Sequence, residues 1–141
     1  MQLYISIPVK PLNLNHCYTI SSIGGKVRRF PSKEYKQYES IVNLELRKYK
    51  AEINKFNKNY NEDEHYIIAE YNFYYPIITK KGNISKRSTD LSNSIKALED
   101  IIFKSFVIDD SQVCELYVRK VHSENIRVEI NFKIRNKKFI S

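Results

Sequence analysis

Four aspartates in the second half of the chain could place carboxylates close together. Asp90 stands where a helix is expected to begin, and Asp100 falls on the polar face of that helix. Asp109 and Asp110 lie in the loop that enters the next strand. Carboxylates at a helix start and at a neighbouring strand start can share one Mg²⁺ ion, which prefers hard oxygen ligands and keeps several waters. The same aspartates also fit structural roles, as a helix cap, a turn and the i,i+4 partner of Lys96.

Basic residues gather in two segments that lack regular helical periodicity. The first extends from residue 10 to 31 as a loop or ribbon with a turn at Gly24-Gly25, and the second surrounds Gly82-Asn83. Their cations are Lys26, Arg28 and Arg29 in the first segment, and Lys80, Lys81, Lys86 and Arg87 in the second. Cations beside a carboxylate cluster suit a phosphodiester held against a metal ion, so we expect them to contact DNA phosphates. Alternatively, they are solvated loop charges without a partner.

The overall charge also favours an anionic partner. Lys+Arg 24 against Asp+Glu 16 gives a formal net charge of +8, which is common in proteins that bind nucleic acid. With 141 residues, 42% of them hydrophobic and 28% charged, the chain is expected to form one globular domain, residues 1–141.

Hydropathy and cysteine usage predict a cytoplasmic protein. The first ten residues alternate in polarity and do not resemble a signal peptide. The longest apolar stretch, residues 73–78, is far shorter than the roughly 20 residues of a membrane span, so no membrane partner is expected. Cys17 and Cys114 form no CxxC pair, which fits reduced thiols, and we assign them no chemistry.

Hydrophobic periodicity predicts an α+β fold. Alternating apolar residues indicate strands at 2–9, 66–75, 113–122 and 125–135. Apolar steps of three and four indicate helices at 32–56 and 92–104. Ser123-Glu124 is expected to join the last two strands as a hairpin. The order of elements predicts a mixed four-stranded sheet with both helices packed on one face.

Two blocks of residues stand at a fixed spacing in this second half. They read Asp90-Leu91-Ser92-Asn93-Ser94-Ile95-Lys96-Ala97-Leu98-Glu99-Asp100 and Asp109-Asp110-Ser111-Gln112-Val113. They resemble the RusA-type Holliday junction resolvases, whose pattern is D-x-D-N-x-x-K-x-x-x-D followed by D-D-x-Q-[VI]. The N-terminal residues Ile7-Pro8-Val9-Lys10-Pro11, Asn13, Asn15 and Tyr18 also look like this family. The resemblance therefore covers nearly the whole chain.

This resemblance implies a small homodimer that cuts four-way DNA junctions symmetrically with Mg²⁺, for which Mn²⁺ is a possible substitute. Asp90 and Asp110 would be metal ligands, and Lys96 would lie by the scissile phosphate. Asn93, one helical turn before Lys96, would orient a carboxylate or a phosphate oxygen.

One departure from the family pattern concerns its second carboxylate, whose position is Ser92 here. A hydroxyl is a weak neutral ligand, so Mg²⁺ binding should be weaker unless another group compensates. The candidates are Asp109 or Asp100 approaching the metal, or Ser92 holding a metal-bound water.

Two other functions remain open at this level. A protein that kept the basic surface but lost cleavage through Ser92 would bind branched DNA without cutting it. An RNA-binding module would instead stack bases on the tyrosines of the strands, which are Tyr66, Tyr71, Tyr74 and Tyr75. Those tyrosines would otherwise belong to a core or a dimer interface.

Overall fold

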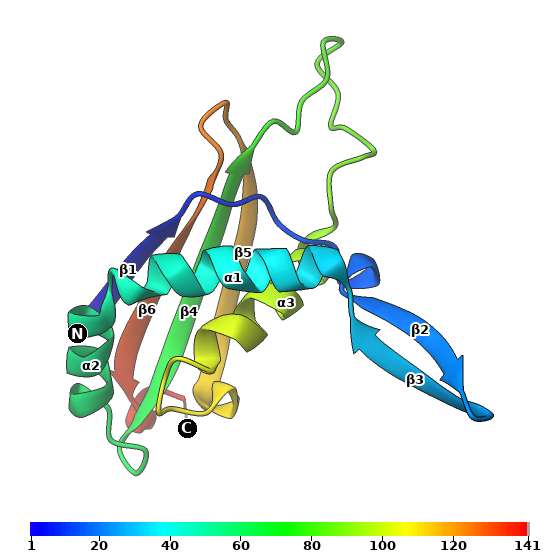
Figure 1. Ribbon diagram of the computed structural model, residues 1–141. Coiled ribbons are helices and arrows are strands. Elements are labelled where there is room, and N and C mark those ends of the chain that lie inside the picture. The colour runs from blue at the N-terminus through cyan, green and yellow to red at the C-terminus, as the bar shows by residue number, and fades with distance from the viewer. Residues whose placement is uncertain (141) are drawn as a thin grey trace.

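A mixed four-stranded sheet forms the centre of the computed structural model, which describes residues 1–140 (Figure 1). Its strands are β1 (Gln2–Ile7), β4 (His65–Tyr75), β5 (Val113–His122) and β6 (Arg127–Asn136). They lie in the order β1-β6-β4-β5. β6 is antiparallel to both β1 and β4, whereas β4 and β5 are parallel. The predicted α+β class with a mixed four-stranded sheet is therefore confirmed.

The last two strands do not form the predicted hairpin. β5 and β6 pair with opposite sides of β4, and the residues between them pass over the end of that strand. The backbone N–H of Ser123 donates to the carbonyl of Tyr75, 3.1 Å away, and fixes this crossing. The sequence prediction failed because alternation reveals which face of a strand is buried but not which strand lies beside it.

The helices are α1 (Lys33–Arg47), α2 (Lys50–Asn59) and α3 (Leu91–Phe103). The single helix predicted at 32–56 is wrong, because the chain turns at Lys48 and Tyr49 and α2 starts again beside β1. The Tyr49 hydroxyl accepts from the backbone N–H of Ser6 at 3.1 Å, which anchors this turn to β1. The apolar stripe continues through the break, from Leu46 to Ile53, so periodicity gave no sign of it.

All three helices pack on one side of the sheet and enclose the hydrophobic core. Figure 1 shows α1 and α3 in front of the strands, with α2 beside β1. Phe56 of α2 and Phe132 of β6 are buried at its centre, with ring centroids 6.3 Å apart. The predicted covering of one face by helices is confirmed, with three helices in place of two.

The strand tyrosines do not form a base-stacking platform. Tyr66, Tyr71 and Tyr75 are only 2%, 0% and 7% exposed. Tyr74 is half-buried, and the guanidinium carbon of Arg127 lies 3.9 Å from its ring centroid. Their packing removes the basis for an RNA-binding module that stacks bases on these rings.

The first basic segment forms a two-stranded ribbon of β2 (Tyr18–Ile23) and β3 (Lys26–Pro31). Gly24 and Gly25 have φ angles of 59° and 76°, as a two-residue hairpin turn of this hand requires. Every residue of β3 is exposed, and the ribbon projects away from the sheet (Figure 1).

Short 3₁₀ turns complete the structure: η1 (Leu14–His16), η2 (Asp110–Gln112) and η3 (Lys137–Phe139). Within residues 1–140, none of the helices has the length and apolar character needed to cross a bilayer.

Candidate active site

α3 carries most of the residues of the first block, and Asp90 stands at its N-cap. The main-chain carbonyl of Asp90 accepts from the N–H of Ser94 at 3.0 Å, which starts the helix. Its side chain makes no capping hydrogen bond and is exposed. The carboxylate is therefore not used by the helix itself, although the positive end of the helix dipole favours a negative charge there.

Lys96 lies at the centre of a group of carboxylates. Its Nζ atom donates to Oδ1 of Asp100 at 3.1 Å, as the i,i+4 spacing predicted. This hydrogen bond and the charge of Asp100 raise the pKa of Lys96, and the nearby Asp110 and Glu99 raise it further. Lys96 is therefore held as a cation beside three carboxyl groups.

Asp109 and Asp110 have different surroundings. Asp109 is exposed, and its Oδ2 accepts from the backbone N–H of Ser111 at 3.1 Å, which is the predicted turn. Hydrogen bonding from Ser111 lowers the pKa of Asp109. Asp110 is half-buried and faces α3, where it interacts with Lys96 and Glu99. The carboxylate of Asp110 therefore interacts with Lys96 and Glu99. The carboxylate of Asp90 lies at the N-terminus of α3 and is not part of this group.

A groove runs along this group from the base of the ribbon. Its wall includes Tyr18, Tyr35, Asp100, Asp109 and Asp110. The rings of Tyr18 and Tyr35 stack with centroids 6.0 Å apart. The guanidinium carbon of Arg29 lies 4.3 Å from the centroid of Tyr18. A cation of the ribbon therefore stands at one end of a groove that holds three carboxylates.

Glu99 is the residue of this group that sequence analysis missed. It lies on the side of α3 between Lys96 and the apolar residues that face the sheet, and its Oε2 atom is buried. Burial raises the pKa of Glu99, and the negative charge of Asp110 raises it further. A carboxylate beside the apolar stripe, three residues after Lys96, was the signal in the sequence that could have revealed it.

Tyr71 of β4 lies behind Glu99. Its side chain is fully buried, and its hydroxyl makes no well-formed hydrogen bond within residues 1–140. Burial raises the pKa of Tyr71 well above 10.0, and the charge of Glu99, its hydrogen bonding with the hydroxyl, and the charge of Asp110 add to this effect. The hydroxyl therefore points into the acidic group rather than into a purely apolar core.

The donors of this group suit a hard divalent cation, although they are not preassembled as a cage. Among residues 1–140, no three or more histidine, cysteine, aspartate or glutamate side chains already surround a point where a metal ion could sit. Asp90 lies nine residues before Glu99, which corresponds to about 13 Å along the helix axis. The unpartnered Oε2 of Glu99 and the carboxylate of Asp110 offer the oxygen ligands that Mg²⁺ and Mn²⁺ prefer.

A family model now relates this arrangement to known proteins. The model of the RusA endodeoxyribonucleases matches residues 9–133 of the 141-residue chain. This chain belongs to the RusA endodeoxyribonuclease family. The resemblance stated from the two blocks is thereby confirmed, and the family supports a nuclease activity. A search of curated proteins found no match.

Two positions of the RusA pattern lie at the start of α3. Ser92, where the pattern has its second carboxylate, is exposed. Asn93 is half-buried, and its backbone N–H donates to the carbonyl of Asp90 at 3.1 Å. Ser92, Lys96 and Glu99 follow one another at steps of four and three, so they share one side of the helix. This RusA chain therefore lacks a carboxylate at position 92. It has one at Glu99, two helical turns further along the same side of α3.

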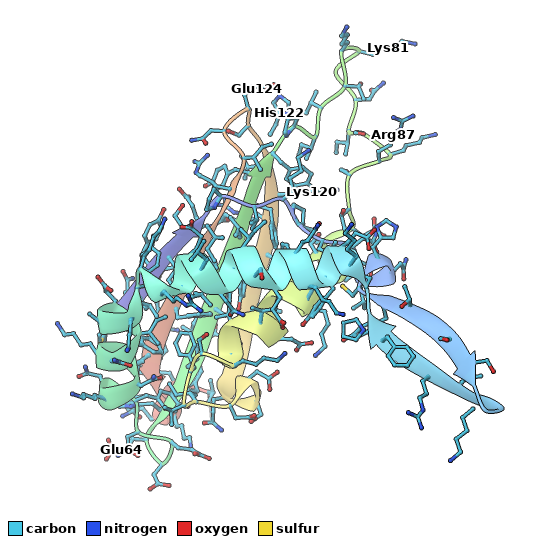
Figure 2. The ribbon with its side chains drawn as sticks, in the orientation of Figure 1. Glu64, Lys81, Arg87, Lys120, His122 and Glu124 are labelled. Atoms are coloured by element: carbon cyan, nitrogen blue, oxygen red, sulfur yellow. The ribbon has the colours of Figure 1, made fainter. Side chains whose placement is uncertain are left out.

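The second basic segment of this RusA chain, residues 76–90, is tied to β5 at both ends. His122 Nδ1 accepts from the backbone N–H groups of Ile77 and Ile78, at 3.0 and 3.2 Å. The Nζ atom of Lys120 donates to Ser88 Oγ at 2.9 Å, just before Asp90. Figure 2 shows Lys81 and Arg87 on the projecting part of this segment, with His122 and Lys120 near its base.

The seven predicted DNA-contacting cations therefore occupy two separate projections. Lys26, Arg28 and Arg29 are exposed on β3, and Lys80, Lys81, Lys86 and Arg87 are exposed in the segment before α3. In Figure 1 the ribbon extends from beside the start of α1, whereas the second segment rises from the end of β4 and returns to the start of α3. None of the seven cations lines the acidic groove, although Arg29 lies against Tyr18 in its wall.

Proposed function

We propose that this chain is a Mg²⁺-dependent endonuclease that resolves four-way (Holliday) DNA junctions in recombination and repair, with Mn²⁺ as a possible substitute. The main support is the group formed by Lys96 and Asp110 at the acidic groove, within a chain that matches the RusA family over residues 9–133. The reaction is hydrolysis of a phosphodiester: water adds across a P–O bond and leaves a hydroxyl and a phosphate.

In this proposal, Asp90 and Asp110 would hold one or two Mg²⁺ ions. Asp109 contributes through the carboxylate oxygen that does not accept from Ser111. A bound ion would polarise the phosphate and lower the pKa of the attacking water. Lys96 stabilises the negative charge that develops on the phosphate, and Asn93 orients a phosphate oxygen.

The two basic projections would bind the arms of the junction. Both carry exposed cations that can pair with phosphates. The second projection leads directly into α3, and the base of the ribbon adjoins the acidic groove at Tyr18. Phosphate contacts of this kind position a nucleic acid without reading its sequence. We therefore propose that the protein selects its substrate by the shape of the branched duplex, because its two separated basic projections can contact different arms of the junction.

Paired cutting requires two active sites related by a twofold axis. We accordingly propose a homodimer, because one chain carries one set of these residues and a symmetric junction offers two equivalent strands. Sedimentation equilibrium of the free protein, and of the protein bound to a junction, would measure this stoichiometry.

The test compares a labelled four-way junction with a linear duplex of matched sequence, with Mg²⁺ or with EDTA. We expect paired nicks in the junction alone and only with Mg²⁺. The exposed hydroxyl of Ser92, where the family has a carboxylate, favours one rival function, a junction-binding protein that does not cut. Tight binding without nicks at any Mg²⁺ or Mn²⁺ concentration would support that rival and contradict the nuclease.

A further inference from the structure

The carboxylate absent at Ser92 raises the question of which group takes its place. Helical spacing puts Glu99 on the same side of α3 as Ser92 and Lys96, two turns further on. Asp110 lies close enough to interact with both Glu99 and Lys96. More carboxylates therefore lie near Glu99, in the second half of α3, than at the N-terminus of the helix.

Two buried oxygen atoms mark this position. Oε2 of Glu99 and the hydroxyl of Tyr71 are both inaccessible to solvent, and among residues 1–140 neither makes a well-formed hydrogen bond, although the two groups interact with each other. Buried polar groups are nearly always hydrogen-bonded, so two buried oxygens without a well-formed hydrogen bond, beside the second carboxylate of Asp110, need an explanation. A bound cation provides one, because it accepts the carboxylate oxygen as a ligand.

Another tyrosine and glutamate, on the opposite face of the sheet, provide a comparison. The hydroxyl of Tyr66, a residue only 2% exposed, donates to Oε2 of Glu115 at 2.8 Å. Glu115 also lies 3.7 Å from Arg135, so its charge is compensated. A tyrosine and a glutamate can thus form a short hydrogen bond in this fold. Tyr71 and Glu99 are close enough for a hydrogen bond to shift both their pKa values, but they make no bond as well formed as that of Tyr66 and Glu115.

We propose that Glu99 acts with Asp110 as a divalent-cation ligand, in addition to Asp90, and so replaces the carboxylate missing at Ser92. Tyr71 is a positioning residue: its buried hydroxyl supports the Glu99 carboxylate from behind. Lys96, unlike the Oε2 atom of Glu99, is exposed to solvent, so a phosphate could approach this site from the side of Lys96. This inference rests on the proposed function, because it assumes that the cation serves phosphodiester hydrolysis.

The test measures Mn²⁺ binding directly, by electron paramagnetic resonance of the free ion, without DNA. We expect Glu99→Gln to weaken Mn²⁺ binding by about tenfold or more, and Glu99→Asp to restore part of the affinity. Tyr71→Phe should weaken binding less than Glu99→Gln does. Glu115→Gln and Tyr66→Phe are the matched controls and should bind Mn²⁺ like the wild type.

A second readout is the rise in melting temperature on adding Mn²⁺, which follows from preferential binding to the folded state. The rise should be smaller in Glu99→Gln than in the wild type. If Glu99→Gln binds Mn²⁺ like the wild type while Asp110→Asn does not, the inference about Glu99 is wrong and the proposed nuclease stands. If the wild type binds no Mn²⁺ and cuts no junction, both the inference and the proposed function are wrong.

Discussion

The Nζ atom of Lys96 lies 3.1 Å from Oδ1 of Asp100, one turn further along α3. A second pair, Glu45 of α1 with Lys48 at the C-cap of that helix, has the same N–O distance of 3.1 Å. Both lysines are more than half exposed, so each pair contributes less than about 1 kcal/mol to stability. The two ion pairs therefore contribute similarly to the stability of the protein. They differ in their surroundings, because only Lys96 lies near Asp110 and Glu99.

This relationship gives a prediction for Lys96→Ala. We expect the rate of junction cleavage to fall by about 100-fold or more, because an ammonium group that stabilises charge in the transition state is lost. Junction affinity should change little, because the two basic projections remain. Single-turnover cleavage and a binding titration in EDTA measure the two effects. The control Lys48→Ala should cut at the wild-type rate; an equal loss in both variants would exclude a specific role for Lys96.

Asp110 and Asp109 are adjacent in sequence, yet their contacts predict different effects. Asp110→Asn should abolish cleavage while junction binding persists, because it removes a carboxylate that interacts with both Lys96 and Glu99. Asp109→Asn should lose less activity, since an asparagine oxygen can still accept the N–H of Ser111.

Asp90→Asn tests the other end of α3 and should also abolish cleavage without loss of binding. The side chain of Asp90 makes no capping hydrogen bond, so this change should leave the melting temperature nearly unaltered. Cleavage at the wild-type rate by either Asp90→Asn or Asp110→Asn would remove that residue from the proposed metal site.

The sequence predicted the sheet and α3 well because their hydrophobic periods are long and regular. It failed at Tyr49, where a tertiary hydrogen bond to Ser6 bends the chain although the apolar stripe continues. It also failed for the pairing of β5 with β4, which depends on neighbours in space. Within the site, Lys96 and Asp100 were predictable from i,i+4 spacing. The position of Glu99, three residues after Lys96, was visible in the sequence, but its contact with the buried Tyr71, 28 positions earlier, was not.

The salt dependence of junction binding should identify the phosphate contacts. The double substitution of Lys80 and Lys81 by alanine should make the slope of log K against log salt concentration less steep by about 2, because each phosphate contact contributes about 0.9. Lys55 and Lys58 of α2, at the opposite end of the molecule in Figure 1, are the control. Their replacement by alanine should leave the slope nearly unchanged. A slope equally altered by both double variants would indicate a general charge effect.

His122 should control the order of the second basic segment. Its Nδ1 atom accepts from the N–H groups of Ile77 and Ile78, so His122→Ala removes both hydrogen bonds. We expect faster hydrogen exchange at these two amides, and weaker junction binding because the projecting cations are less well positioned. The exposed His16 in η1 is the control, and His16→Ala should not change exchange at Ile77. Unchanged exchange in His122→Ala would contradict this role.

Glu99 also makes the stability of the metal-free protein depend on pH. Burial, together with repulsion from Asp110, raises the pKa of Glu99 in the folded state above its ordinary value of 4.5. The folded state then favours the protonated carboxyl group. The associated stability is fully present below pH 4.5 and is lost as the pH rises through the raised pKa.

We therefore expect the melting temperature of Glu99→Gln, measured in EDTA, to rise relative to the wild type as the pH increases from about 4 to about 8. A glutamine has no charge to bury, so its folding does not require desolvation of a carboxylate. Adding Mn²⁺ at the upper pH should stabilise the wild type, because the cation compensates the buried charge. The difference in melting temperature between Glu99→Gln and the wild type should then become smaller. If the difference in melting temperature between the two proteins stays constant over this pH range, the pKa of Glu99 is not raised by folding and this prediction is wrong.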